Sequence, residues 1–185
     1  MVNFDYQTPT RLIFGKGVVS EKLASVMNQY GKRVLITYGG GSIKRTAPGH
    51  DKSLYDLVKD TLTDKQVFEL GGIQPNPKFN PSVLDGVRMC QDNDIDVILA
   101  VGGGSVLDCT KAIAGVAGTL KTKVTDNVEE AWDIVCGRKP TTAAVPIVDI
   151  ITMAATGSEY DMGGVISRTE TNDKLAYFSN SYSRQ

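Results

Sequence analysis

Two Gly-Gly-Gly-Ser runs, at residues 39–42 and 102–105, are the part of this sequence best suited to bind a ligand. Each run follows an apolar segment typical of a buried strand, and the second leads into an Ala-rich helical segment. Glycines let the backbone approach a phosphate closely, and a helix N-terminus offers unpaired N–H groups and a positive dipole end. We therefore interpret Gly103, Gly104 and Ser105 as a pyrophosphate cradle. A tight turn without a ligand remains the alternative for each run.

The second run departs from the common phosphate-binding motifs. Leu107 stands where the dinucleotide fingerprint requires its third glycine, and the chain has no Gly-Lys-Ser/Thr of a P-loop. Asp108 and Lys111 follow on one face of the expected helix, either as a solvated surface pair or with Asp108 orienting the turn or a ligand hydroxyl. Thr152 and Thr156 follow a later apolar segment, where their hydroxyls either bind a nucleotide or cap a helix.

Composition excludes several other kinds of chemistry. The one histidine, His50, is expected to be an exposed spacer, and one histidine cannot build a His-rich metal site. Cys90, Cys109 and Cys136 are odd in number and irregularly spaced, so we expect reduced thiols in a cytoplasmic protein. The net charge of −1 argues against a nucleic-acid partner. We also expect no secretory signal and no membrane contact, because no apolar run approaches ~20 residues.

Alternating strand and helix patterns must position these residues. Strands are expected at residues 11–14, 34–37, 66–70, 96–101 and 143–148. Helices are expected at residues 18–30, 53–62, 81–93, 105–116 and 128–135. Residues 165–168 and 174–178 are expected to pair as a small β-hairpin. Repeated strand–helix units predict an α/β fold, with a Rossmann-like, mostly parallel sheet and helices on both faces, in one domain over residues 1–185.

Several motifs together resemble one family. Residues 102–111, GGGSVLDCTK, resemble the G-G-G-S-x-x-D-x-x-K motif of the iron-containing (group III) alcohol dehydrogenases. Residues 156–159, TGSE, and residues 75–77, PNP, resemble two further motifs of that family. Residues 8–17 and 34–42 are similar to its butanol dehydrogenase branch, which reduces aldehydes with NADPH. The resemblance extends over about residues 3–180.

The resemblance implies a dehydroquinate synthase-like, dinucleotide-binding N-terminal half of an enzyme that moves a hydride between NADP(H) and a primary alcohol or aldehyde. By motif position, the residues expected to bind the cofactor are Gly39, Gly40, Ser42, Asn76, Gly102, Gly103, Gly104, Ser105, Asp108, Thr152, Thr156 and Lys174. Members that prefer NAD carry an aspartate after the second strand. Residues 39–42 contain no carboxylate, and Lys44 or Arg45 is available for a 2′-phosphate, so NADP is preferred over NAD.

The resemblance also implies what this chain lacks. Complete members are about twice as long and hold their metal with one aspartate and three histidines in a helical C-terminal domain. Iron or zinc is therefore expected only in that domain, which is absent here, and no catalytic or metal-binding residue is assigned. We expect little or no turnover by this chain alone, and a homodimer. A truncated, non-catalytic nucleotide-binding or dimerisation module is the alternative, and a glycerol, propanediol or dehydroquinate-synthase-like enzyme is a third. Asp161 departs from the family, which often has asparagine there.

Overall fold

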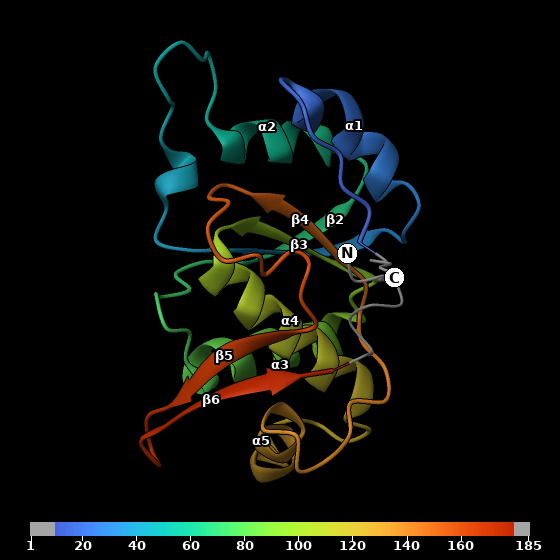
Figure 1. The fold of residues 1–185 in the computed structure, drawn as a ribbon. Helices are drawn as coiled ribbons and strands as arrows, with labels where there is room; N and C mark the ends of the chain where they lie inside the picture. The colour runs from blue at the N-terminus through green and yellow to red at the C-terminus, as the bar shows by residue number, and fades with distance from the viewer. Residues whose placement is uncertain (1–9, 180–185) are drawn as a thin grey trace, which may run out of the picture.

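A parallel four-stranded sheet forms the centre of the molecule (Figure 1). The structure is a computed structural model and describes residues 10–179. The strands lie in the order β2-β1-β3-β4, with every neighbouring pair parallel. The central strands, rich in β-branched residues, are almost fully buried, whereas the edge strands are only half-buried. The bounds are β1 (Arg33–Tyr38), β2 (Gln66–Leu70), β3 (Val97–Gly102) and β4 (Ile147–Ile151).

Helices cover both faces of this sheet, because alternate residues of each central strand point to opposite sides. Val34 and Ile36 of β1 pack with the first two helices, whereas Leu35 packs on the other side. In Figure 1, α1 (Val18–Met27) and α2 (Leu54–Thr61) lie above the sheet. Below it lie α3 (Leu84–Asn93) and α4 (Gly104–Thr119), with α5 (Val128–Val135) packed on the outside of α4.

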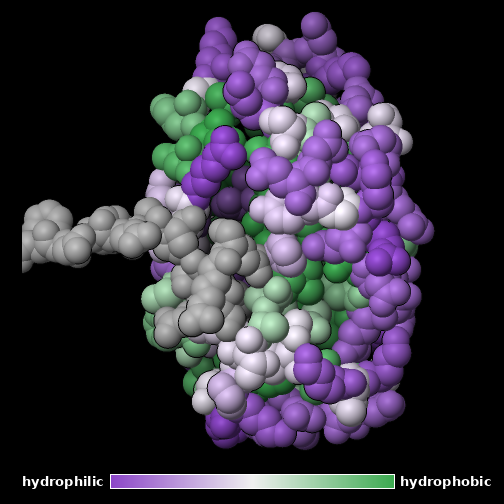
Figure 2. Space-filling view, turned by 90° about the vertical axis from the view of Figure 1, so that its right-hand side faces the viewer, coloured by the Kyte–Doolittle hydropathy of each residue, from purple (hydrophilic) through white to green (hydrophobic). Residues whose placement is uncertain are grey.

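The face shown in Figure 2 is mainly polar, with hydrophobic areas between the polar side chains. The large apolar side chains most exposed to solvent include Phe14, at 91%, Phe178, at 75%, and Met153, at 68%. Within residues 10–179, no helix has both the length and the apolar character that crossing a bilayer requires.

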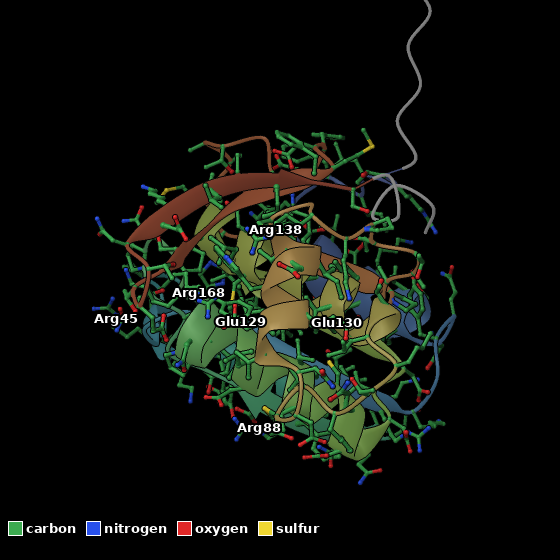
Figure 3. All side chains as sticks on the ribbon, turned by 90° about the horizontal axis from the view of Figure 1, so that it is seen from below. Arg45, Arg88, Glu129, Glu130, Arg138 and Arg168 are labelled. Carbon is green, nitrogen blue, oxygen red and sulfur yellow. The ribbon has the colours of Figure 1, made fainter. Side chains whose placement is uncertain are left out.

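A two-stranded antiparallel hairpin, β5 (Gly163–Arg168) and β6 (Asp173–Phe178), packs against α4. Arg168 attaches the end of β5 to α5: its guanidinium lies 5.5 Å from the ring centre of Trp132 and 5.6 Å from that of Phe79. The same side chain forms an ion pair with Glu129 (Figure 3). These contacts place the hairpin beside the same helix that begins at the second glycine run.

The α/β fold with a mostly parallel sheet and a small hairpin is confirmed, with four local corrections. Residues 11–14 form no strand and have no partner strand within the described part of the chain. The first helix ends at Met27 rather than at residue 30. After it, the Gln29 and Tyr30 amides donate to the carbonyls three residues earlier, which tightens the last turn. Residues 81–83 belong to a π-helical turn (Phe79–Val83) before α3. Thr8 and Pro9 of the opening motif lie outside the described residues.

The fourth correction concerns the last strand of the sheet, which begins at Ile147 rather than at residue 143. Ala143 and Val145 bond to α4, and the ladder to β3 begins at the Pro146 carbonyl, which accepts from the Ile98 amide at 2.8 Å. The Val145 amide donates to the Ala114 carbonyl, and the Thr119 hydroxyl donates to the Ala143 carbonyl. Pro146 has no N–H group to donate to the ladder, and β4 begins at the next residue.

Candidate functional site

The candidate site lies where the chain reverses its direction of winding across the sheet. From β1 the chain moves outward to β2 and then crosses back to β3, on the other side of β1. Open parallel α/β sheets bind ligands at such a switch point, beyond the ends of the two central strands. The glycine runs 39–42 and 102–105 lie at the ends of these two strands. Val106 lies against both runs, because a Cβ added at Gly39 or Gly102 would meet its side chain at 3.7 and 2.6 Å.

Helix α4 begins at Gly104 without a side chain that caps its first turn. The amides of Val106 and Leu107 donate to the Gly103 carbonyl. The amides of Gly104 and Ser105 belong to those that an α-helix leaves without an intrahelical partner at its start. Together with the positive end of the helix dipole, they suit a phosphate group.

The loop after β4, residues 152–162, closes against Gly104. A Cβ at Gly104 would lie 2.5 Å from the Thr156 Oγ1 atom and 2.7 Å from its Cγ2 atom. Only glycine fits at this position with the loop in place. The Thr152 amide donates to the Gly102 carbonyl at 2.9 Å, which continues the β3–β4 ladder beyond the strands. The structure thus brings Thr152 and Thr156 against the second glycine run.

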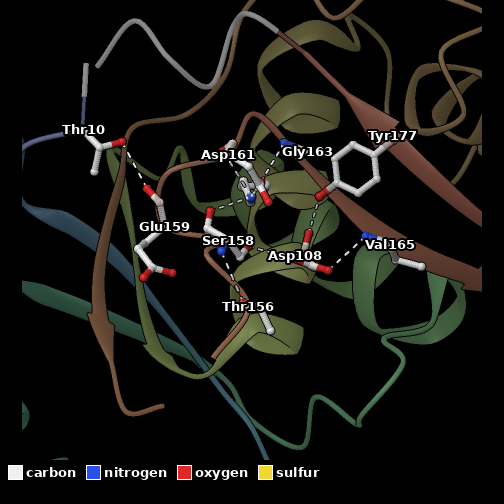
Figure 4. A network of polar contacts seen from close by, with 10 residues as sticks. Thr10, Asp108, Thr156, Ser158, Glu159, Asp161, Gly163, Val165 and Tyr177 are labelled. Carbon is white, nitrogen blue, oxygen red and sulfur yellow. Dashed lines mark hydrogen bonds and ion pairs between the residues drawn. The ribbon is translucent and has the colours of Figure 1, made fainter. Parts of the chain in front are cut away.

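Asp108, on the second turn of α4, is bound by the chain itself (Figure 4). One carboxylate oxygen accepts from the Ser158 hydroxyl at 2.7 Å, and the other accepts from the Val165 amide at 2.9 Å. The Tyr177 hydroxyl donates to the main-chain carbonyl of Asp108. Its carboxylate therefore joins α4 to the 152–162 loop and to β5, and both of its oxygens are engaged.

Lys111, one turn further along α4, is 3% exposed. Its ammonium group donates to the Ser158 carbonyl at 2.9 Å and to the Asp161 carboxylate at 2.6 Å. The alternative of a solvated surface pair is therefore wrong for Lys111. The aspartate at residue 161 supplies the charge that pairs with this lysine.

Asn76 and Lys174 contact each other although 98 residues separate them, with the ammonium donating to the amide oxygen at 2.7 Å. Asn76 has a left-handed backbone, with φ of 55°, a conformation that asparagine tolerates better than most residues. Both residues line a cavity of about 310 Å³, together with Lys78 and Arg168. The hairpin end and the turn after β2 thus form one polar, basic hollow.

The turn after β1 is open and basic. A Cβ at Gly40 or Gly41 would meet no heavy atom within 4 Å. The short 3₁₀ turn Ser42–Lys44 follows, and the Lys44 ammonium lies 4.8 Å from the ring centre of Tyr38 and 4.5 Å from that of Tyr55. The contact with Tyr38 raises the pKa of Lys44, so this lysine remains charged at neutral pH.

The nearest carboxylate to this turn, Glu69 on β2, is already compensated. It accepts from Lys59 at 2.9 Å and from the hydroxyls of Tyr55 and Tyr38 at 2.9 and 3.1 Å. Burial favours a higher pKa for Glu69, but the hydrogen bonds from Lys59 and Tyr55 outweigh it and lower the pKa. Its charge is held within this cluster and is not free to repel an anion at the turn.

The described residues contain no group that fits a metal ion. Between residues 10 and 179, no three side chains of histidine, cysteine, aspartate or glutamate come together as ligands. Asp149 on β4 is a single carboxylate with one buried oxygen that lacks a hydrogen-bond partner there. No metal-dependent step can therefore be derived from this part of the chain.

The structure brings most of the expected cofactor-binding residues to one edge of the sheet. Those at the ends of β1, β2, β3 and β4 are Gly39, Gly40, Ser42, Asn76, Gly102, Gly103, Gly104, Ser105, Thr152 and Thr156. Lys174 reaches the same edge through Asn76, and Asp108 lies behind it, against the hairpin. Sequence reasoning missed the buried role of Lys111 and the bond from Tyr177. The spacing of Lys111, seven residues after Gly104 on the same helical face, was the available signal.

Known proteins of one family are similar to this chain. The family model described as iron-containing alcohol dehydrogenase matches residues 9–183. A probable NADH-dependent butanol dehydrogenase 2 from Bacillus subtilis is 46% identical over 182 residues, which are 97% of this chain and 43% of that protein. The NADPH-dependent aldehyde reductase YqhD from Escherichia coli is 40% identical over 179 residues, again covering 97% of this chain and 43% of the relative.

Solved structures show the same relationship. The crystal structure of E. coli YqhD superposes with a TM-score of 0.80 at 41% identity and covers 98% of this chain and 43% of that one. The NADH-dependent butanol dehydrogenase A from Thermotoga maritima gives a TM-score of 0.82 at 33% identity over 97% of this chain and 42% of that one. The present chain thus spans less than half the length of these relatives. It belongs to the iron-containing alcohol dehydrogenase family.

Proposed function

We propose that this chain is the cofactor-binding part of an oxidoreductase that transfers a hydride between NADP(H) and a primary alcohol or aldehyde. The observation that carries the proposal is the meeting of two glycine runs at the switch point of the sheet, beside an uncapped helix N-terminus. Backbone amides and missing side chains at such a point suit a dinucleotide pyrophosphate.

In this proposal, different residues bind different parts of the dinucleotide. The first turn of α4, with Gly103, Gly104 and Ser105, binds the pyrophosphate, and Thr156 covers it from the loop. Residues 39–42 receive the adenosine ribose, and Asn76 with Lys174 contacts a ribose of the nucleotide. When bound, the nicotinamide supplies or accepts the hydride. The chain's own residues bind the cofactor and fix its orientation.

Preference for NADP over NAD is part of the proposal, and relatives of both kinds exist. The butanol dehydrogenases from Bacillus subtilis are named as NADH-dependent, whereas YqhD is named as NADPH-dependent. In this chain the turn after β1 has no side chain at Gly40 or Gly41, and it places the charged Lys44 close by. An open, basic turn without a free carboxylate favours the additional phosphate of NADP.

Calorimetric titration of the 185-residue chain with NADPH and with NADH tests this proposal. We expect tighter binding of NADPH, and we expect Lys44→Ala to reduce NADPH affinity about tenfold while leaving NADH affinity nearly unchanged, since ~1.4 kcal/mol of charge interaction is lost. Lys22→Ala, at an exposed lysine of α1, is the matched control. Equal affinity for NADPH and NADH would contradict the preference for NADP. If neither cofactor binds, the proposed function is wrong.

The substrate and the metal remain proposals for the whole protein. A primary alcohol or aldehyde is the substrate, and iron or zinc is held outside the described residues, which contain no ligand cluster. A non-catalytic nucleotide-binding or dimerisation module is the second candidate, because residues 10–179 hold the uncapped helix N-terminus but no group of three metal-ligating side chains. Oxidation of NADPH with butanal and Fe²⁺ or Zn²⁺, measured after adding the C-terminal half of a relative, separates the two. Turnover supports the enzyme, and binding without turnover supports the module.

We also propose a homodimer located in the cytoplasm. Leu12, at 63% exposed, and Phe14, at 91%, are apolar side chains that an interface between two copies would cover. All three cysteines are free thiols, which is consistent with the reducing conditions of the cytoplasm. Light scattering with size-exclusion chromatography tests the dimer, and a Phe14→Lys variant is expected to shift it toward the monomer.

A further inference from the structure

Three residues on one face of α4 all contact the segment that follows β4. Gly104, Asp108 and Lys111 are separated by four and three residues, so they project from the same side of the helix. Gly104 lies against Thr156, Asp108 binds Ser158, and Lys111 binds both Ser158 and Asp161. These three contacts are made over one continuous stretch of the loop, residues 156–161.

Lys111 is the member of this set whose burial is costly. A lysine ammonium is rarely buried unless it is paired and hydrogen-bonded, and the side chain of Lys111 is only 4% exposed. Its three donors have oxygen acceptors: the Ser158 carbonyl at 2.9 Å, the Asp161 carboxylate at 2.6 Å and, at 3.4 Å, the Asp161 carbonyl. Its ion-pair partner Asp161 is half-exposed on the loop. The charge of Asp149 also interacts with that of Lys111, and Glu159 interacts with Asp149.

The contacts of Lys111 differ in kind from those of Asp108. Asp108 binds the Ser158 side chain and the first residues of β5. Lys111 binds main-chain carbonyls, so it fixes the path of the backbone itself at Ser158 and Asp161. The Asp161 carboxylate also accepts from the Gly163 amide at 3.0 Å, which ties the end of the loop to the start of the hairpin (Figure 4).

The position of this backbone determines what happens at the glycine turn. Thr156 lies two residues before Ser158, and its hydroxyl accepts from the Ser158 amide at 3.3 Å. The same hydroxyl is the atom nearest to a Cβ built at Gly104. If residues 158–161 moved away from α4, Thr156 would move away from the helix N-terminus with them.

We propose that Lys111 is a positioning residue, whose buried ammonium holds residues 156–161 over the N-terminus of α4 so that Thr156 and Gly104 together form the phosphate-binding turn. This inference rests on the proposed binding of a dinucleotide. Lys111 touches no cofactor itself, because its donors are occupied by the loop. It acts through the order of the loop backbone.

Hydrogen exchange and NADPH titration of the 185-residue chain test this role. Lys111→Met keeps the aliphatic stem and removes the donors. We expect the amides of residues 156–163 to exchange at least tenfold faster, those of β1 and β3 to remain unchanged, and NADPH affinity to fall about tenfold. Lys123→Met removes a lysine from an exposed ion pair with Asp92 and is the matched control.

Two variants at Asp161 keep the test decisive if Lys111→Met does not fold. Asp161→Ala removes one acceptor at a half-exposed position and is expected to accelerate exchange in the same segment, whereas Asp161→Asn retains an acceptor and is expected to preserve protection. Exchange and affinity that match the Lys123→Met control overturn the proposal, as does unchanged exchange in Asp161→Ala. If the unsubstituted chain binds no dinucleotide, the proposed function fails, and the exchange rates alone decide whether Lys111 orders the loop.

Discussion

The glycines of the two runs differ sharply in how much space surrounds them. At Gly104 an added Cβ would lie within 3.0 Å of three Thr156 side-chain atoms, whereas at Gly40 it would meet nothing within 4 Å. The cause of any requirement for glycine at residue 104 is therefore contact with another part of the chain. From the sequence alone, that requirement could be attributed to a bound phosphate or to a tight turn, and the contact with Thr156 could not be seen.

Gly104→Val is expected to lower the free energy of unfolding by about 1–3 kcal/mol, since overpacking of a close contact costs that much. It is also expected to weaken NADPH binding, because the 152–162 loop must shift to accommodate the side chain. Gly40→Val should change the unfolding free energy by less than about 0.5 kcal/mol. Urea denaturation of both variants checks this, and equal stabilities would contradict the packing described for Gly104.

Asp149 is the described carboxylate least suited to its surroundings. Burial, followed by the nearby charge of Glu159, raises the pKa of Asp149 above its ordinary value, and one of its oxygens lacks a hydrogen-bond partner among residues 10–179. Asp149→Val should therefore stabilise the chain at pH 7 by about 1 kcal/mol, the lower end of the cost of an unsatisfied buried polar group.

The pH dependence of this gain follows from the direction of the pKa shift. Below the unfolded-state pKa, near 3.8, Asp149 is protonated in both states and the ionic penalty is absent. As the pH rises through the higher pKa of the folded state, the charged form must be kept buried, and the penalty reaches its full size. Thermal unfolding of both proteins between pH 3.5 and 8 measures it. A gain that shrinks as the pH rises would show that Asp149 is stabilised in its charged form.

At the scale of elements, the partners of a strand were harder to predict than whether a segment is a strand or a helix. The strands at residues 33–38 and 97–102 and the helix at residues 128–135 were predictable because their apolar patterns are long and local. The strand at residues 11–14 was not, since four apolar-rich residues carry no information about whether a partner strand exists. The start of β4 was misplaced because Ala143 and Val145 bond to α4, an interaction between distant segments.

Arg168 of the hairpin contacts α5 through Trp132 and Glu129. Arg168→Ala removes the stacking on Trp132 and Phe79 and is expected to lower the free energy of unfolding by about 1–3 kcal/mol. Trp132 is the sole tryptophan, so its emission should shift to longer wavelength as solvent reaches it. Glu129→Gln, at a side chain that is 74% exposed, should cost less than about 1 kcal/mol. Unchanged emission in Arg168→Ala would refute this account of hairpin docking.

At the scale of the whole molecule, the winding of the chain creates the candidate site. The sequence order β1, β2, β3 becomes the spatial order β2, β1, β3, and this rearrangement brings two glycine runs 63 positions apart to the same crevice. The motifs could be read from the sequence because they are contiguous. The contacts that hold the loop over them could not, because Asp108 and Ser158 are 50 positions apart, and the spacing of Lys111 from Gly104 indicates a shared helix face without identifying what covers it.

The contacts between α4 and the 152–162 loop also determine when the glycine turn can form during synthesis of the chain. A ribosome releases the β3–α4 turn first, and more than fifty further residues must emerge before Val165 can bond to Asp108. Ser158 and Asp161 emerge only a few residues before Val165, so through most of that interval Asp108 lacks its partners and the Lys111 ammonium lacks the carbonyls that compensate its burial. A nascent chain that ends before the loop therefore presents its glycine turn without the cover of Thr156. Recognition of a nucleotide during synthesis becomes possible only after the 152–162 loop and β5 have emerged, and NADPH added to stalled chains should protect only those that extend past β5.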